Sequence, residues 1–142
     1  MAKNTNPIFE LEPRLDVATL TAANTAKDGS GTITTLVTGH AEGTRIDLIT
    51  FISAQASVTT NSAMMCRVYV SNDNGSTWTF WDEVALGATA GSNSAPGAKG
   101  QIPFPQGLKL KNANYKIGIT KSVHAGAQDE VDAIAEGGDF AA

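Results

Sequence analysis

The segment 71–78 constrains the fold of this chain more than any other part of the sequence. It reads Ser-Asn-Asp-Asn-Gly-Ser-Thr-Trp and lies between two stretches rich in apolar residues. Asn74-Gly75 tolerates the positive φ angles that a tight reversal between two strands requires, and the Asp73 carboxylate can accept backbone N–H groups within the turn. Trp78 offers a large apolar surface that can cover the base of the hairpin. We therefore predict a β-hairpin whose structural turn is formed by Asp73, Asn74, Gly75 and Trp78.

Length and composition favour one all-β domain. A chain of 142 residues fits a single domain and can bury a core without a metal or a disulfide. Charged residues make up 17% of the sequence, against about 25% in ordinary soluble proteins. No stretch repeats apolar side chains at the period of a helix. We predict a single-domain β-sandwich or jelly roll of about eight strands over residues 16–142, preceded by an extended N-terminal arm over residues 1–15.

Alternating apolar side chains locate the strands. The strongest candidate covers residues 45–58, where we expect Ile46, Leu48, Ile52 and Ala54 on one face and Ile49 and Phe51 on the other. Apolar residues on both faces indicate a strand that is buried by a second sheet or by a neighbouring subunit. The other predicted strands are 16–23, 32–37, 63–70, 78–86, 108–110, 115–123 and 129–140.

Two segments carry apolar residues that the predicted sandwich does not need. In the arm, Ile8, Phe9 and Leu11 lie between two prolines, in a stretch too short to form its own core. Residues 87–100 form a long loop, and long loops without structure of their own often interact with something. Ile102-Pro103-Phe104-Pro105 follows, and its two prolines favour a docked segment over a hydrogen-bonded strand. We predict partner contacts by Ile8, Phe9, Leu11, Ile102 and Phe104.

The charge pattern and the absence of apolar runs exclude several classes of partner. The chain has 10 basic and 14 acidic residues, a net charge of −4, and no basic cluster that could neutralise phosphates. Nucleic-acid binding is therefore not expected. The first residues lack the apolar core of a signal peptide, and no run of 18 apolar residues is present. We expect neither secretion nor a membrane span.

The residues that most often carry catalysis or bind metals occur here in structural contexts. His40 and His124 lie next to turn glycines, without a Cys, Asp or Glu at the spacing of metal ligands, so we expect exposed or turn-capping roles. Cys66 lies in an apolar run, where a small buried side chain is expected rather than a reactive thiol. Asp129, Glu130 and Asp132 lack the loop pattern of a calcium site, so we expect a solvated acidic face. We predict no catalytic residue, no metal and no cofactor.

The octet 71–78 also matches the Asp-box pattern S-x-D-x-G-x-T-W, which resembles a turn that recurs on the blades of sialidases and other β-propellers. Here the pattern occurs once, in a chain too short for several four-stranded blades. Sialidases share an arginine cluster, whereas the arginines of this chain, Arg14, Arg45 and Arg67, form no motif. We therefore interpret the octet as a structural turn.

A second resemblance covers roughly residues 46–140. Four features follow one another: the strand 45–58, the hairpin strand 64–70, the proline-bearing segment 102–105 with Leu108-x-Leu110, and the closing Gly137-Gly138-Asp139-Phe140. In this order they resemble small structural proteins of tailed bacteriophages. The resemblance implies a virion protein made in the host cytoplasm and not secreted. It implies a capsid decoration or cement protein that binds the major capsid protein or another virion protein as a symmetric homo-oligomer, for which a trimer is one option.

Two alternatives remain open at this stage. The same sandwich would serve in a tail-, neck- or fibre-associated structural protein. It would also serve in a carbohydrate-binding module, with Trp78, Trp81, Tyr69 and Tyr115 as stacking residues. Against a single stacking platform, Trp78 and Trp81 are three residues apart and should point to opposite faces of a strand.

Overall fold

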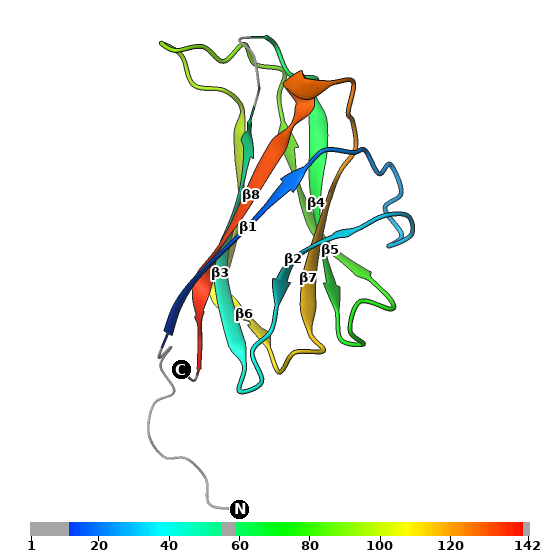
Figure 1. Cartoon of the computed structure of the whole chain (residues 1–142), viewed down its shortest axis with the longest axis vertical. Helices are drawn as coiled ribbons and strands as arrows, with labels where there is room; N and C mark the ends of the chain where they lie inside the picture. Colours follow the sequence, from blue (N-terminus) through cyan, green and yellow to red (C-terminus); the bar gives the residue numbers. More distant parts are fainter. Residues whose placement is uncertain (1–11, 55–58, 141–142) are drawn as a thin grey trace, which may run out of the picture.

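The computed structural model describes residues 12–54 and 59–140. Its strands form two four-stranded antiparallel sheets that face each other, with the strand orders β1-β8-β3-β6 and β2-β7-β4-β5 (Figure 1). The elements are β1 (Glu12–Leu20), β2 (Thr34–Thr38), β3 (Thr44–Ser53), β4 (Met64–Ser71), β5 (Thr79–Leu86), β6 (Lys99–Leu110), β7 (Lys116–Lys121), the short 3-10 helix η1 (Ala127–Asp129) and β8 (Val131–Asp139). The predicted all-β sandwich is confirmed.

The strand pairing identifies the sandwich as a jelly roll. β1 pairs with β8, β2 with β7, β3 with β6 and β4 with β5. This is the pairing of one long hairpin rolled up into two sheets, which is the jelly-roll arrangement. Strands that are distant in the sequence therefore lie side by side, and the two edges of each sheet are β1 and β6 in one, and β2 and β5 in the other.

The core lies between the two sheets, and β3 contributes to it in a way that the sequence pattern did not predict. A register shift between Ile46 and Leu48 interrupts the alternation of this strand. Ile46, Ile49 and Phe51 are all fully buried, whereas Leu48 and Ile52 are only half-buried. The predicted grouping of Ile46 with Leu48 and Ile52 was therefore wrong, because a bulge at this point moves Ile46 to the inner face.

The proline-bearing segment belongs to a strand. Residues 102–105 lie within β6, where Ile102 pairs with Ile49 and Pro103 with Leu48. The prediction that residues 102–105 form a docked segment outside the β-ladder was therefore wrong. β6 is an edge strand, and an edge tolerates proline because one side of the strand needs no N–H donor.

The sandwich begins earlier than the predicted arm boundary at residue 15. β1 starts at Glu12 and pairs with β8 from Glu12–Asp139 to Leu20–Val131. Arg14 fixes this end of the strand, with its Nε 2.7 Å from an Asp16 carboxylate oxygen and its Nη1 3.2 Å from the Asp139 carboxylate. Residues 12–15 are thus part of the sheet, and the contacts predicted for Ile8, Phe9 and Leu11 lie outside the described residues.

The 71–78 turn is organised around the Asp73 carboxylate. Asn74 and Gly75 both have positive φ angles, 63° and 84°. Asp73 accepts hydrogen bonds from the Thr77 hydroxyl at 2.5 Å, from the Thr77 backbone N–H at 2.9 Å and from the Ser71 hydroxyl at 2.7 Å. These bonds lower the pKa of Asp73 to about 2, with the Thr77 hydroxyl as the largest cause.

The lowered pKa of Asp73 predicts a pH-dependent contribution to stability. The contribution is fully present above the ordinary pKa of 3.8 and is lost as the pH falls through about 2. An Asp73→Asn variant should therefore melt at a lower temperature than the unmodified protein at pH 7, and the difference should narrow between pH 4 and pH 2. Thermal unfolding followed by circular dichroism measures both. A difference that stays constant down to pH 2 would contradict this account of the turn.

Candidate functional site

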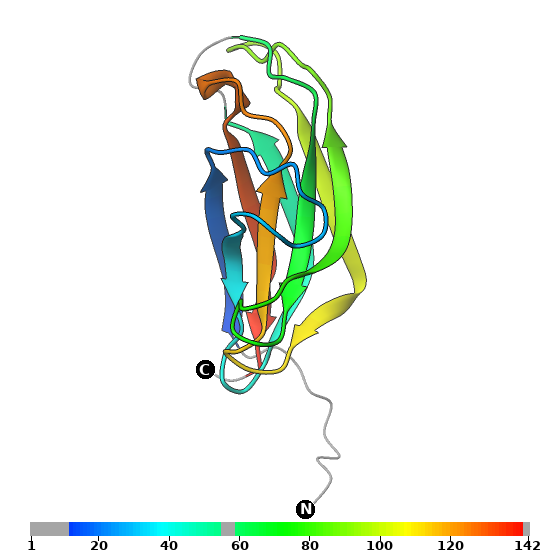
Figure 2. The same ribbon diagram turned by 90° about the vertical axis from the view of Figure 1, so that its right-hand side faces the viewer.

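The two sheets differ in what covers their outer faces. The loop 21–33 lies over the outer face of the β2-β7-β4-β5 sheet, and Figure 2 shows it in blue, crossing in front of β7. The Tyr69 hydroxyl donates to the Ala26 carbonyl at 2.9 Å, and the Lys27 ammonium lies 4.7 Å from the centre of the Phe80 ring. This outer face is therefore closed by the chain itself.

Trp78 completes the cover of this sheet. A Cβ built on Gly118 of β7 would lie 2.7 Å from the Trp78 ring and 2.4 Å from Ile33. The indole and Ile33 thus occupy the space in which a side chain at position 118 would lie. This packing explains why the tryptophan follows the turn directly and why it is half-buried rather than exposed.

The outer face of the β1-β8-β3-β6 sheet carries apolar side chains that no loop within residues 12–54 and 59–140 covers in this way. Leu15 and Val17 of β1 are 64% and 68% exposed. The strand register places Val17 beside Ile134 and Leu48 beside Pro103. We define the open face as Leu15, Val17, Leu48, Ile52, Pro103 and Ile134.

Polar residues lie among the apolar residues of the open face, on the same strands. Glu136 lies in register between Leu15 and Leu48, and Asp132 between Thr19 and Ile52. The Thr19 hydroxyl donates to the Asp132 carboxylate at 2.5 Å. A shallow hollow of about 460 Å³ lies over Val17, Thr19, Asp132 and Ile134. A face on which apolar and polar side chains are mixed has the composition of a non-obligate protein–protein contact surface.

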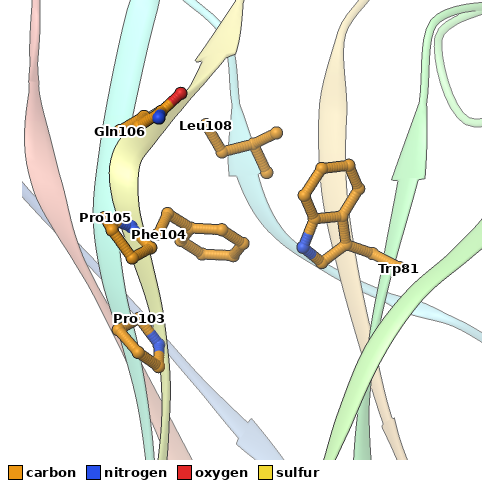
Figure 3. A pocket seen from close by; sticks show the side chains of 7 residues that line it. Trp81, Pro103, Phe104, Pro105, Gln106 and Leu108 are labelled. Carbon is orange, nitrogen blue, oxygen red and sulfur yellow. The ribbon is translucent and has the colours of Figure 1, made fainter.

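A second apolar surface lies at the side of the sandwich, where β5 and β6 are edge strands. Trp81 is 49% exposed, and its ring centre lies 6.0 Å from that of Phe104, with the planes inclined at 53°. Together with Pro103, Pro105 and Leu108 these residues line a hollow of about 400 Å³ (Figure 3). Phe104 thus lies at a surface hollow although only 6% of it is exposed, whereas Ile102 is 2% exposed and packs in the core.

The four aromatic residues of the carbohydrate-binding alternative do not share a surface. Tyr69 is fully buried, Tyr115 is half-buried against the core, and Trp78 packs on Gly118. Trp81 faces the β6 edge instead. The structure therefore presents one exposed aromatic side chain from this set rather than a platform.

A buried polar cluster lies at one end of the sandwich. Lys121 and Asp129 are both fully buried. The Asp129 carboxylate accepts hydrogen bonds from the backbone N–H groups of Ser62 and Ala125 at 2.6 and 2.7 Å and from the Ser62 hydroxyl at 3.0 Å. The Lys121 ammonium donates to the Asp129 backbone carbonyl and lies 3.0 Å from Nδ1 of His124. Burial lowers the pKa of Lys121.

This cluster corrects two expectations. Asp129 does not belong to a solvated acidic face, because it is buried at the end of η1 and its carboxylate accepts a hydrogen bond from the Ser62 backbone N–H. His124 is not isolated, because its ring contacts Lys121. The signal was present in the sequence: position 121 continues the alternation of Ile117 and Ile119, which predicts an inward side chain whatever its type.

The remaining candidates have structural surroundings. His40 caps its own turn, accepting the Glu42 backbone N–H at 3.1 Å through Nδ1. Cys66 is fully buried, and burial raises the pKa of its thiol to about 12, so the expected packing role is confirmed. Within residues 12–54 and 59–140, no group of three or more His, Cys, Asp or Glu side chains could hold a metal ion. No helix of the described chain is long and apolar enough to cross a membrane.

Comparisons with known proteins find no matching family model and no matching curated protein. Among solved structures, the VP2 subviral particle of infectious bursal disease virus matches with a TM-score of 0.32 and 16% identity, over 99% of this chain and 37% of that one. The Gx strain of the same virus matches with a TM-score of 0.31 and 16% identity, over 95% and 37%. The Gt strain matches with 0.27 and 20%, over 96% and 36%. The chain thus spans little more than a third of these proteins.

Proposed function

We propose that this protein is a structural component of a virion, and that it is a decoration or cement protein that binds the assembled capsid through the open face. The observation that carries the proposal is the difference between the two sheets. One outer face is closed by the chain's own loop and tryptophan, and the other leaves Leu15 and Val17 largely exposed. A stable β-sandwich gains nothing by exposing such residues unless a partner covers them.

The size of the open face fits a specific contact. Four strands about 4.8 Å apart and about nine residues long span roughly 20 by 30 Å, or about 600 Å². Standard interfaces bury about 800 Å² on each partner. The sheet face, with its borders, therefore supplies most of one partner's share without any rearrangement of the fold.

Fold and sequence support the same class of function. Jelly rolls occur in viral capsid proteins as well as in lectin domains, and the order of motifs over residues 46–140 resembles small structural proteins of tailed bacteriophages. A protein that binds only the assembled shell, across subunit joints, stabilises that shell by mass action. The role needs binding surfaces and no catalytic residues.

The proposal is tested by adding the purified protein to capsids that lack it. The protein should sediment with the capsids on a density gradient, saturate at a fixed ratio to the capsid subunit, and raise the temperature at which the capsids release their contents. Protein that stays at the top of the gradient at every concentration would contradict the capsid role. Sedimentation with isolated tails would instead favour the tail-, neck- or fibre-associated alternative.

The carbohydrate-binding alternative keeps one supporting observation, the exposed Trp81 beside an apolar hollow. An aromatic ring of this kind can stack on a sugar. A glycan array decides the matter. Binding that is lost in a Trp81→Ala variant would support this function, and an array without signal would remove it.

A further inference from the structure

A groove runs along the side of the sandwich between the edge strands β5 and β6. The hollow at Trp81 and Phe104 has Leu108 in common with a second hollow of about 280 Å³, which is lined by apolar residues such as Leu110 and Tyr115 and by polar residues such as Asn72 and Thr77. We call the surface formed by the two hollows the β5–β6 groove. It lies at the side of the sandwich and adjoins the open face, the outer surface of one sheet, at Pro103.

Bulges in both edge strands shape the groove. Ile46 pairs with Leu108 while Leu48 pairs with Pro103, so residues 104–107 stand opposite Asp47 alone and β6 bends outward. In β5, Val68 pairs with Asp82 and Tyr69 with Phe80, which leaves Trp81 unpaired at a second bulge. The bulges separate two edges that would otherwise close over the core, and they place an indole between them.

The chemistry of the groove selects apolar side chains. Its wall on β6 consists of Pro103, Phe104, Pro105 and Leu108, with Gln106 as a polar member. The two prolines lack N–H donors, so this stretch of the edge is poorly suited to pairing with an added strand. An occupant is therefore held by side chains that insert beside Trp81, and not by a continuous ladder of backbone hydrogen bonds.

We propose that the β5–β6 groove binds residues 1–11 of a second copy of this chain, which insert Ile8 and Phe9 beside Trp81. This segment precedes β1 and carries Pro7, Ile8, Phe9 and Leu11. Its proline favours an extended backbone, and its apolar side chains match the lining of the groove in chemistry. The proposal does not depend on the shell-binding role.

The reach of the segment favours a second copy over its own chain as the partner. The Cα atom of Phe9, three residues before Glu12, can be at most about 11 Å from the start of β1. β1 and β6 are the opposite edges of one sheet, and three interstrand spacings of about 4.8 Å separate them by about 14 Å in a straight line. The groove lies beyond β6, and a path around the sheet is longer still. The segment of a second copy is not limited in this way, so we assign the occupant of the groove to a second copy.

Each copy carries one segment and one groove on different surfaces, so the contact is heterologous. Such contacts close into rings when the rotation between copies allows it. The contact reaches the open face only at Pro103, so its other members, among them Leu15 and Val17, stay available in the oligomer. A ring built in this way presents several open faces at once, which would strengthen binding to a repetitive surface.

The test uses two variants of the full chain with complementary defects. Phe9→Asp removes the inserting side chain and keeps the groove, whereas Trp81→Ala opens the groove and keeps the segment. Size-exclusion chromatography with light scattering should show an oligomer for the unmodified protein and monomers for each variant, because losing the aromatic contact weakens association about 100-fold. Mixing the two variants should restore one productive contact per pair and give a 1:1 dimer. Val17→Ser, on the open face, is the control and should leave the oligomer unchanged.

Three results would overturn the proposal. The first is a monomeric unmodified protein. The second is a mixture of Phe9→Asp and Trp81→Ala that stays monomeric although both variants keep the melting temperature of the unmodified protein. The third is an oligomer that neither substitution weakens, which would place the contact elsewhere. None of these results bears on capsid binding through the open face, so the two proposals fail independently.

Discussion

The substitution Val17→Glu is expected to weaken binding of the protein to its capsid about 100-fold while leaving the fold unchanged. Val17 is 68% exposed on the edge strand β1 of the open face, beside Ile134. Loss of its burial in the complex removes about 1.5 kcal/mol. Placing an unpaired carboxylate in the contact costs at least as much again. The sum corresponds to two decades of affinity.

Ala85→Glu is the matched control for this prediction. Ala85 is an exposed residue of β5, on the other sheet, so the substitution introduces the same charge at a strand position outside the open face. Both variants should unfold within about 0.5 kcal/mol of the unmodified protein, since each changes a surface position. Capsid binding by co-sedimentation should fall for Val17→Glu alone. Equal binding by the two variants would mean that the open face does not contact the capsid.

The largest loss of stability is expected from Asp129→Ala. The substitution removes the acceptor of the Ser62 and Ala125 N–H groups and the negative charge that most favours the ammonium of the buried Lys121. Each unsatisfied donor costs about 1–3 kcal/mol, so the free energy of unfolding should fall by about 3–5 kcal/mol. Urea denaturation measures the change.

A pair of variants separates the charge of Asp129 from its hydrogen bonds. Asp129→Asn keeps an acceptor oxygen but removes the negative charge that most favours the Lys121 ammonium. Adding Lys121→Met to Asp129→Asn removes that uncompensated charge, and should recover part of the lost stability. A change of less than about 0.5 kcal/mol for Asp129→Ala, the size of an ordinary surface substitution, would show that this cluster does not hold the end of the sandwich together.

Local patterns were enough to predict the fold class. Alternating side chains and the 71–78 turn act over a few residues, and each strand that they predict overlaps a strand of the structure. Most ends shift by a few residues, but β6 begins at Lys99 and not at the predicted residue 108. Which strands pair is a property of the whole chain. The jelly-roll order depends on contacts between strands as distant as β1 and β8, and no local pattern encodes it.

The errors have specific causes. The bulge at Asp47 reverses the side-chain alternation of β3, and a strict period of two cannot anticipate it. The prolines of residues 102–105 predicted a segment outside the β-ladder. They are compatible with a strand only because β6 is an edge strand, and this is known only from the sheet order. The predicted arm extends to residue 15, whereas β1 begins at Glu12 and includes Pro13, which an edge strand tolerates.

The candidate surfaces were less accessible to prediction than the fold. Phe104 was identified from its apolar context, but its neighbour across the groove, Trp81, comes from another sheet. The apolar residues on both faces of the predicted strand 45–58 indicated that a second sheet or a neighbouring subunit covers this strand. The open face includes the outer side of the same strand, β3. Only the loop over the opposite sheet shows which outer face the chain covers itself and which it leaves exposed.

Electron cryomicroscopy of intact particles that contain this protein tests the central claim most directly. The account predicts density for the jelly roll at repeated positions of the capsid lattice, with Leu15, Val17 and Ile134 turned toward the shell and the covered sheet turned outward. Density confined to the tail, or a capsid-bound molecule whose β1-β8-β3-β6 sheet faces the solvent, would contradict it.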